Sequence, residues 1–219
     1  MTRRKSLPAI LLTGFEPFGG ETCNPSWDAV AALHGRRIAG HRVASRRLPV
    51  VFGESLKVLR DAIRELDPAL VLCVGQAGGR TAVSFERVAI NIDDARIPDN
   101  ANACPVDAAV VQGGPAAYFA TLPIKAMHAA VRAAGIPAEV SQTAGTYVCN
   151  HVFYGLMHAL RRRKVRAGFV HIPWSPGQAA SKAGAPSLPV DCVVDALRIA
   201  LRIAVATPRD ARIAAGTEH

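Results

Sequence analysis

Residues 69–79 read Ala-Leu-Val-Leu-Cys-Val-Gly-Gln-Ala-Gly-Gly, and they indicate the fold class. The first six residues are apolar without interruption, which is typical of a strand buried on both faces of a parallel sheet. The glycine-rich turn that follows ends this strand. Similar short apolar runs predict further strands at residues 9–13, 43–48, 83–90, 138–141 and 167–172.

Helical patterns separate most of these runs. Asn24 can cap a first helix, Pro25 suits its first position, and Gly35 is placed to end it. The other helices are expected at residues 54–65, 123–134, 150–162 and 189–204. Strands interleaved with helices predict a three-layer α/β/α sandwich around a mixed, mostly parallel sheet, of the phosphorylase/hydrolase-like kind.

The length and composition predict one domain over residues 1–219, since 219 residues that are 50% hydrophobic can bury a sizeable core. We expect the basic leader, residues 1–6, and the tail, residues 206–219, to be flexible. The apolar run after the leader is too short for a signal peptide and lacks a cleavage site. No stretch approaches the roughly 18 to 20 apolar residues of a membrane span, so a soluble protein is expected.

The charge and the cysteine content limit which binding partners and which cellular compartment are expected. The net charge of +9 is spread along the chain without a nucleic-acid motif, so it predicts solvated surface and no nucleic-acid partner. Five cysteines without a CxxC spacing argue against disulfides or a zinc ribbon and indicate a reducing cytoplasm. The glycine turns at residues 14–20 and 75–79 match neither nucleotide-binding pattern, which disfavours a phosphate ligand.

One cysteine stands out as a candidate nucleophile. Residues 141–150 lead from a strand through a turn of small residues into a helix, which places Cys149 near the helix N-terminus, where a thiolate is favoured. Cys73 and Cys192 lie in apolar patterns typical of core residues. Cys23 and Cys104 lie in loops without a nearby histidine in the sequence.

A base and an acid can be proposed from their positions in strands. His171 ends an apolar run before a proline-rich loop, and strand ends in α/β folds face clefts. His151 and His158 are expected to be structural or surface residues, because helical spacing turns them away from Cys149. Glu86 lies in an apolar strand, where it could orient a histidine, form an ion pair with a neighbour such as Arg87, or lie on the surface.

Several motifs together resemble the pyroglutamyl peptidase I family. Their order and spacing fit from about residue 11 to residue 204, which makes chance agreement implausible. The motifs are LTGF (12–15), PFGG (17–20), NPS (24–26), GQAGGR (75–80), ERVAIN (86–91), DARIPDN (94–100), AGTYVCN (144–150) and HIP (171–173).

The resemblance implies a cysteine peptidase that removes an N-terminal pyroglutamate from peptides without a metal or cofactor. It implies a homodimer or homotetramer. It also implies a residue set: the triad Cys149, His171 and Glu86; the oxyanion candidates Arg96 and backbone N–H groups near Cys149; and the ring-binding residues Phe15, Phe18, Gln76, Tyr147 and Val148.

Two departures and two alternatives stay open from the sequence. Tyr147 stands where the family pattern predicts phenylalanine, and residues 174–178 differ from the usual segment. Another Cys-His-Glu amidohydrolase, such as a glutamine amidotransferase, would show glycines flanking its nucleophile, which Val148 and Asn150 replace here. A non-catalytic pyroglutamyl-peptide binder would be expected to lack a triad member, and all three are present.

Overall fold

A seven-stranded sheet forms the centre of the molecule, in the order β2-β3-β1-β4-β9-β5-β8. The computed structural model describes residues 7–216. Neighbouring strands are parallel except for β2–β3 and β5–β9, which are antiparallel. The strands are β1 (Ala9–Phe15), β2 (Arg37–Ile38), β3 (His41–Leu48), β4 (Leu70–Gln76), β5 (Val83–Glu86), β8 (Ala138–Ser141) and β9 (Arg166–Ile172).

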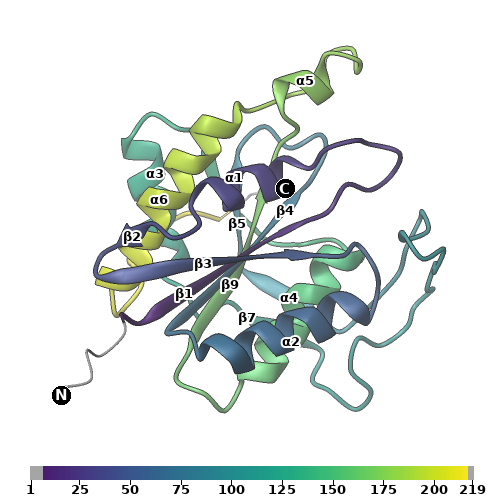
Figure 1. Ribbon diagram of the computed structural model, residues 1–219, viewed down its shortest axis with the longest axis horizontal. Helices are drawn as coiled ribbons and strands as arrows, with labels where there is room; N and C mark the ends of the chain where they lie inside the picture. The colour runs from purple at the N-terminus through teal and green to yellow at the C-terminus, as the bar shows by residue number, and fades with distance from the viewer. Residues whose placement is uncertain (1–6, 217–219) are drawn as a thin grey trace.

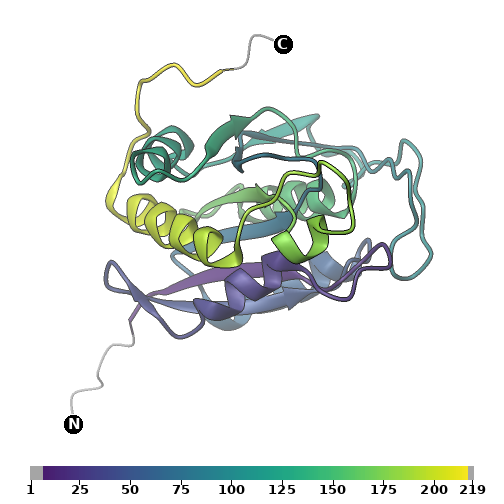
Figure 2. The ribbon, with the colours of Figure 1, turned by 90° about the horizontal axis from the view of Figure 1, so that it is seen from above.

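Helices cover both faces of this sheet, which confirms the three-layer expectation (Figures 1 and 2). One face carries α1, α3 and α6, and the other carries α2 and α4. A short α5 lies in the loop after β9. The helices are α1 (Pro25–Ala32), α2 (Glu54–Leu66), α3 (Ile124–Ala133), α4 (Val148–Leu160), α5 (Pro176–Ala179) and α6 (Val190–Ala206).

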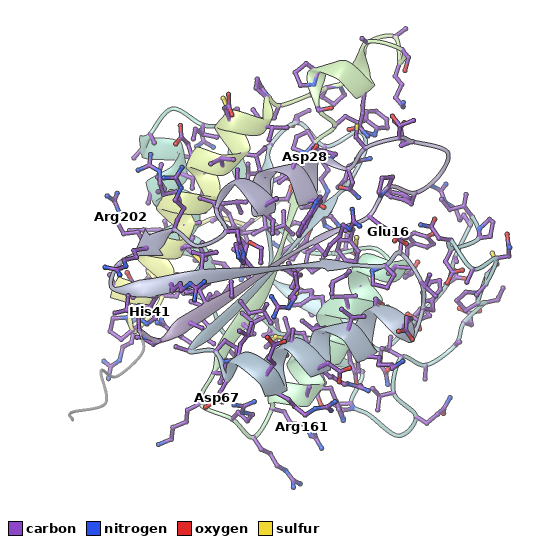
Figure 3. All side chains as sticks on the ribbon, viewed as in Figure 1. Glu16, Asp28, His41, Asp67, Arg161 and Arg202 are labelled. Carbon is purple, nitrogen blue, oxygen red and sulfur yellow. The ribbon has the colours of Figure 1, made fainter. Side chains whose placement is uncertain are left out.

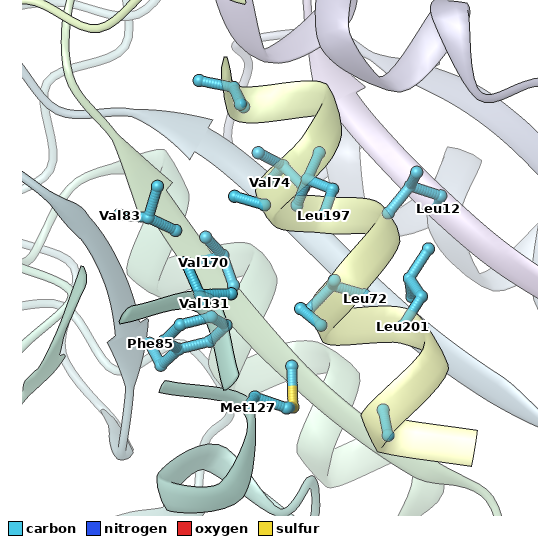
Figure 4. Close-up of a cluster of buried hydrophobic side chains, with 14 of the residues drawn as sticks. Leu12, Leu72, Val74, Val83, Phe85, Met127, Val131, Val170, Leu197 and Leu201 are labelled. Atoms are coloured by element: carbon cyan, nitrogen blue, oxygen red, sulfur yellow. The ribbon is translucent and has the colours of Figure 1, made fainter. Parts of the chain in front are cut away.

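The apolar run of β4 supplies both halves of the core. Leu70 and Leu72 pack into the cluster under α1, α3 and α6, whereas Val71 and Cys73 pack into the cluster under α2 and α4. This division follows from the pleat, which points successive side chains to opposite faces. Figure 4 shows Leu72 packed near Leu201 of α6 in the first of these clusters.

The single strand expected at residues 83–90 is wrong, because the chain changes sheets at Arg87. The backbone N–H of Arg87 donates to Ser141 O at 2.9 Å, at the end of the large sheet, and its carbonyl accepts from Ala120 N at 2.9 Å. Residues after Arg87 therefore form β6 (Val88–Ile90), which pairs antiparallel with β7 (Ala117–Phe119) in a separate two-stranded sheet.

The ends of the elements agree with the capping signals. The side chain of Asn24 accepts a hydrogen bond from Ser26 N at 3.0 Å, as expected of the N-cap of α1.

The C-terminal segment is attached to α3, since Asp210 accepts from the backbone N–H of Ala126 at 2.9 Å. The leader at residues 1–6 and the last three residues of the tail lie outside the described residues.

Charged residues are spread over the periphery of the molecule, as the sequence predicted, apart from the buried carboxylates of Glu86, Asp93 and Asp99. Asp67, Arg161 and Arg202, labelled in Figure 3, are exposed at its edge. No helix within residues 7–216 has both the length and the apolar character needed to cross a bilayer.

Parallel neighbours β1, β4 and β9 end at the same edge of the sheet. Phe15 is the last residue of β1, Gln76 is the last of β4, and His171 is next to last in β9. The fold thus brings together side chains that are far apart in the sequence, in the position where α/β proteins bind their ligands.

Candidate active site

Cys149 is the second residue of α4. Strand β8 ends at Ser141, a turn follows, and Tyr147 in an extended conformation is the N-cap of the helix. The N–H groups in the first turn of a helix have no partner inside the helix, so they are free to face a ligand. The structure therefore places the cysteine at the helix start, as the sequence predicted, although α4 begins two residues earlier than the expected residue 150.

His171 and Glu86 form a buried hydrogen-bonded pair. His171 Nδ1 lies 2.8 Å from Glu86 Oε1, and the two residues are 3% and 0% exposed. Because an ionised carboxylate can only accept, Nδ1 carries the proton and Nε2 is the basic nitrogen. Glu86 is thus neither a surface residue nor a partner of Arg87, which were the alternatives open from the sequence.

The thiol of Cys149 lies beside the strand that carries His171. In the parallel register of β4 and β9, Gly75 is the partner of His171. A Cβ atom added to Gly75 would lie only 2.8 Å from Cys149 Sγ, so the sulfur rests directly on the glycine backbone. Because Gly75 has no side chain, the thiol can lie against β4 at the residue that is paired with His171.

These groups open onto a cavity of about 320 Å³ with mostly apolar walls. All five ring-binding candidates line it together with Cys149 and His171. The lining residues are Phe15, Phe18, Asn24, Val50, Gln76, Ala77, Arg80, Thr143, Ala144, Gly145, Tyr147, Val148, Cys149 and His171.

Aromatic contacts hold one wall of the cavity. The rings of Phe18 and Tyr147 lie 6.2 Å apart between centroids, and Phe52 packs edge-on against Tyr147 at 5.6 Å. The hydroxyl that distinguishes Tyr147 from phenylalanine donates to Pro98 O at 3.0 Å. It therefore joins the cavity wall to the loop after β6 and does not introduce an unpaired polar group.

The surroundings of Cys149 raise the pKa of its thiol, whereas the helix N-terminus was expected to lower it. Burial raises the pKa of the thiol to about 12, with the negative charge of Glu86 as the next cause and Arg80 opposing the rise. Burial therefore opposes the thiolate that the helix N-terminus favours. A nucleophilic sulfur requires a base that removes its proton.

Arg80 is a cavity residue that the sequence analysis did not select, and Arg96 lies elsewhere. Arg80 Nη2 donates to Glu86 Oε1 at 3.1 Å. Arg96, the oxyanion candidate, is exposed and does not line the cavity. The signal for Arg80 was available, because a carboxylate in an apolar strand needs a cationic partner and the GQAGGR motif supplies one.

The two other histidines near Cys149 in the sequence have partners outside the cavity. His151 is buried, its Nδ1 lies 2.8 Å from Asp93 Oδ2, and its Nε2 accepts from Gly53 N at 2.9 Å. His158 Nδ1 lies 2.9 Å from the Tyr118 hydroxyl. Within residues 7–216, no cluster of three or more histidine, cysteine or acidic side chains is arranged to hold a metal ion.

Known proteins match this chain over nearly all of its length. The pyroglutamyl peptidase family model matches residues 8–207. The pyrrolidone-carboxylate peptidase of Erwinia tasmaniensis is 59% identical over 210 residues, which cover 96% of this chain and 99% of that protein. That of Klebsiella pneumoniae is 57% identical over 214 residues, 97% of this chain and 100% of that protein.

Solved structures agree with the sequence relatives. The crystal structure of pyroglutamyl peptidase I from Bacillus amyloliquefaciens is 49% identical, with a TM-score of 0.93 over 95% of this chain and 100% of that one. Pyrrolidone carboxyl peptidase from Thermococcus litoralis is 33% identical, with a TM-score of 0.92 over the same shares of both chains. On the extent of these matches, the chain belongs to the pyroglutamyl peptidase family.

Proposed function

We propose that Cys149, His171 and Glu86 carry out the cleavage by which this cysteine peptidase releases an N-terminal pyroglutamate. The observation that supports these roles is the buried His171–Glu86 pair, which opens onto the same cavity as the thiol. The cavity also contains the aromatic and amide groups suited to an uncharged lactam ring. Neither another Cys-His-Glu amidohydrolase nor a non-catalytic binder is favoured by the family membership.

In the first half of the reaction, Nε2 of His171 takes the thiol proton as Cys149 Sγ bonds to the pyroglutamyl carbonyl carbon. Transfer at the moment of attack suits a thiol whose pKa lies well above neutrality. Glu86 holds the imidazole by Nδ1 and stabilises the imidazolium that forms. N–H groups in the first turn of α4 are the proposed donors to the oxyanion, whereas the exposed Arg96 has no role in this scheme.

In the second half, the imidazolium gives its proton to the leaving amine as the peptide C–N bond breaks. A water molecule, deprotonated by His171, then attacks the thioester carbon and releases pyroglutamate with restoration of the thiol. The oxyanion donors and His171 serve both halves, so no further group is needed.

Ring recognition is proposed for the remaining cavity residues. Phe15 and Phe18 bracket the pyrrolidone ring, and Tyr147 and Val148 complete its apolar enclosure. Gln76 has its Oε1 atom engaged as acceptor from Gln178 Nε2 at 3.0 Å, so its own amide N–H groups remain to donate to a lactam carbonyl. A charged α-amine would be disfavoured in the same place because the cavity offers it little compensation.

We also propose a cytoplasmic location and an assembly of two or four copies for this protein. All five cysteines are free, which fits a reducing cytoplasm. A homodimer or homotetramer is proposed from the resemblance, with the exposed apolar side chains of Val106 and Phe119 as candidates for a contact between copies. Light scattering after gel filtration measures the number of copies directly.

The test of the function compares turnover of a pyroglutamyl amide carrying a fluorogenic leaving group with its prolyl and glutaminyl counterparts. Selective pyroglutamyl turnover that iodoacetamide abolishes supports the proposal. We expect Cys149→Ala to lose activity while it keeps its free energy of unfolding, and Cys192→Ala, altered on α6 away from the cavity, to keep its activity. Full activity in Cys149→Ala would overturn the assigned roles, and ammonia release from glutamine would favour an amidohydrolase of another kind.

A further inference from the structure

The carboxylate of Glu86 is compensated at one oxygen only. Its Oε1 atom receives both His171 Nδ1 at 2.8 Å and Arg80 Nη2 at 3.1 Å. Its Oε2 atom is buried and has no hydrogen-bond partner among residues 7–216. A fully buried carboxylate is stable as an anion only when a cation or strong donors compensate it. The neutral imidazole is one donor, and Arg80 is the only one of the two with a permanent charge.

We propose that Arg80 is a positioning residue of the peptidase site, which keeps Glu86 ionised and directed at His171 and so sets the proton affinity of the base. This inference rests on the proposed roles of Cys149, His171 and Glu86. It extends the triad by a fourth group that contacts neither the thiol proton nor the scissile bond.

Arg80 is itself held in place from two sides. Its Nη2 also donates to Thr143 O at 2.9 Å, in the turn that leads into α4. Its Nη1 donates to Glu139 Oε1 at 3.3 Å, and the same oxygen accepts from the Ser84 hydroxyl at 2.6 Å. Ser84 and Glu139 are register partners on β5 and β8, so the guanidinium is anchored to the strand that carries Glu86 and to its neighbour.

The planar guanidinium suits this position better than another cation. It reaches a buried carboxylate, a half-exposed carboxylate and a backbone carbonyl at once, through two nitrogens of fixed geometry. The arginine therefore connects the acid of the triad with the turn that precedes the nucleophile. A lysine would keep the positive charge but not this set of contacts.

The charged and titratable groups around the base come from four elements. Glu86 lies on β5, Cys149 on α4, Glu139 on β8 and Arg80 in the turn after β4. With Arg80 present, the negative charge of Glu86 and the positive charge of Arg80 offset each other beside the imidazole. Without Arg80, either Glu86 takes up a proton and becomes neutral, or His171 takes up a proton and its imidazolium balances the carboxylate. Both responses increase the proton affinity of the His171–Glu86 pair.

The experiment compares Arg80→Met, Arg80→Lys and the matched control Arg87→Gln, which alters the arginine next to Glu86 in the sequence. We expect Arg80→Met to lower kcat roughly 10- to 100-fold, by analogy with the removal of carboxylates that orient metal-bound histidines. Its acidic limb of kcat/KM against pH should move upward by about one unit. Arg80→Lys should restore the limb but only part of kcat, and Arg87→Gln should match the wild type.

A second readout needs no turnover. The imidazole of His171, followed by NMR in the free protein, should titrate at higher pH in Arg80→Met than in the wild type. Because this measurement involves no substrate, it separates failure of the Arg80 proposal from failure of the proposed function. If Arg80→Met does not fold, Arg80→Gln, which removes the same charge, takes its place in the titration.

Two outcomes would overturn the proposal. The first is a folded Arg80→Met variant whose pH profile and His171 titration equal those of the wild type. The second is an increase in KM alone with the acidic limb in place, which would make Arg80, as a residue that lines the cavity, a substrate contact.

Discussion

Gly75→Ala adds a side chain where Cys149 Sγ rests against the backbone of β4. The added methyl carbon would lie 2.8 Å from Cys149 Sγ and 2.9 Å from Phe169 Cζ. Ordinary contact begins at 3.4 Å, so the sulfur would have to move by about 0.6 Å and the Phe169 ring by about 0.5 Å, unless the backbone of Gly75 shifts instead. Phe169 has little freedom, because it is 1% exposed and packs against Phe153 with ring centroids 5.8 Å apart. The sulfur is therefore displaced.

The Gly75→Ala substitution should lower both the stability and the activity of the protein. Insertion of a methyl group into a packed interior destabilises a protein by about 1–3 kcal/mol. A displacement of about 1 Å at a reacting group can lower the rate about 100-fold, so the smaller shift here predicts a loss of roughly 10- to 100-fold in kcat/KM. The loss should appear mainly in kcat, since Gly75 does not line the cavity.

The assay measures kcat and KM for a pyroglutamyl amide, together with urea unfolding of the same preparation. Gly177→Ala is the matched control, because an added Cβ there meets no atom within 4 Å. We expect the control to keep both its activity and its stability within error. Wild-type kcat/KM in a folded Gly75→Ala variant would refute the idea that the glycine positions the sulfur.

Two further predictions concern ionisation and the cavity wall. Burial raises the pKa of both Cys73 and Cys149 from 9.0 to about 12. Between these two pH values the folded state binds more protons than the unfolded state. The free energy of unfolding therefore falls as the pH rises above 9. In urea titrations under reducing conditions, the free energy of unfolding of Cys73→Ser should fall less steeply with pH than that of the wild type. At pH 7 it should be lower by about 1–3 kcal/mol, because a hydroxyl replaces an apolar group in β4. An equally steep fall with pH in the variant would contradict the pKa argument. Tyr147→Phe removes the hydrogen bond to Pro98 O, worth about 1 kcal/mol, and should change KM less than about fivefold with kcat unaltered; a large fall in kcat would show that the hydroxyl acts in the chemistry instead.

Long and strongly patterned elements were predictable from the sequence. The uninterrupted apolar run in β4 and the capping signal at Asn24 both have local causes, and the structure agrees with both. The break at Arg87 has no local cause, since it depends on hydrogen bonds to Ser141 and Ala120, which are distant in the sequence. The short β7 and α5 were also missed, because elements of three or four residues carry too little periodicity.

The site shows the same division. The position of His171 at a strand end and that of Cys149 at a helix start could be predicted, because each depends on one element and its neighbour in the chain. The pairing of Arg80 with Glu86 depends on how the turn after β4 folds against β5. The outward position of Arg96 depends on the path of the long loop after β6, whose composition does not determine its conformation.

Selection of the substrate and activation of the nucleophile place opposite demands on this cavity. An uncharged lactam ring is bound best by apolar walls from which water is excluded, and the same exclusion of water raises the pKa of Cys149. A permanent thiolate would place an anion beside the ring, and an anion would favour the charged α-ammonium group of ordinary N-termini. Attack coupled to proton transfer avoids this conflict, because the sulfur becomes anionic only as it bonds to carbon. On this argument, the positive charge belongs where the structure has Arg80, against the carboxylate that pairs with His171 and away from the ring-binding wall of the cavity.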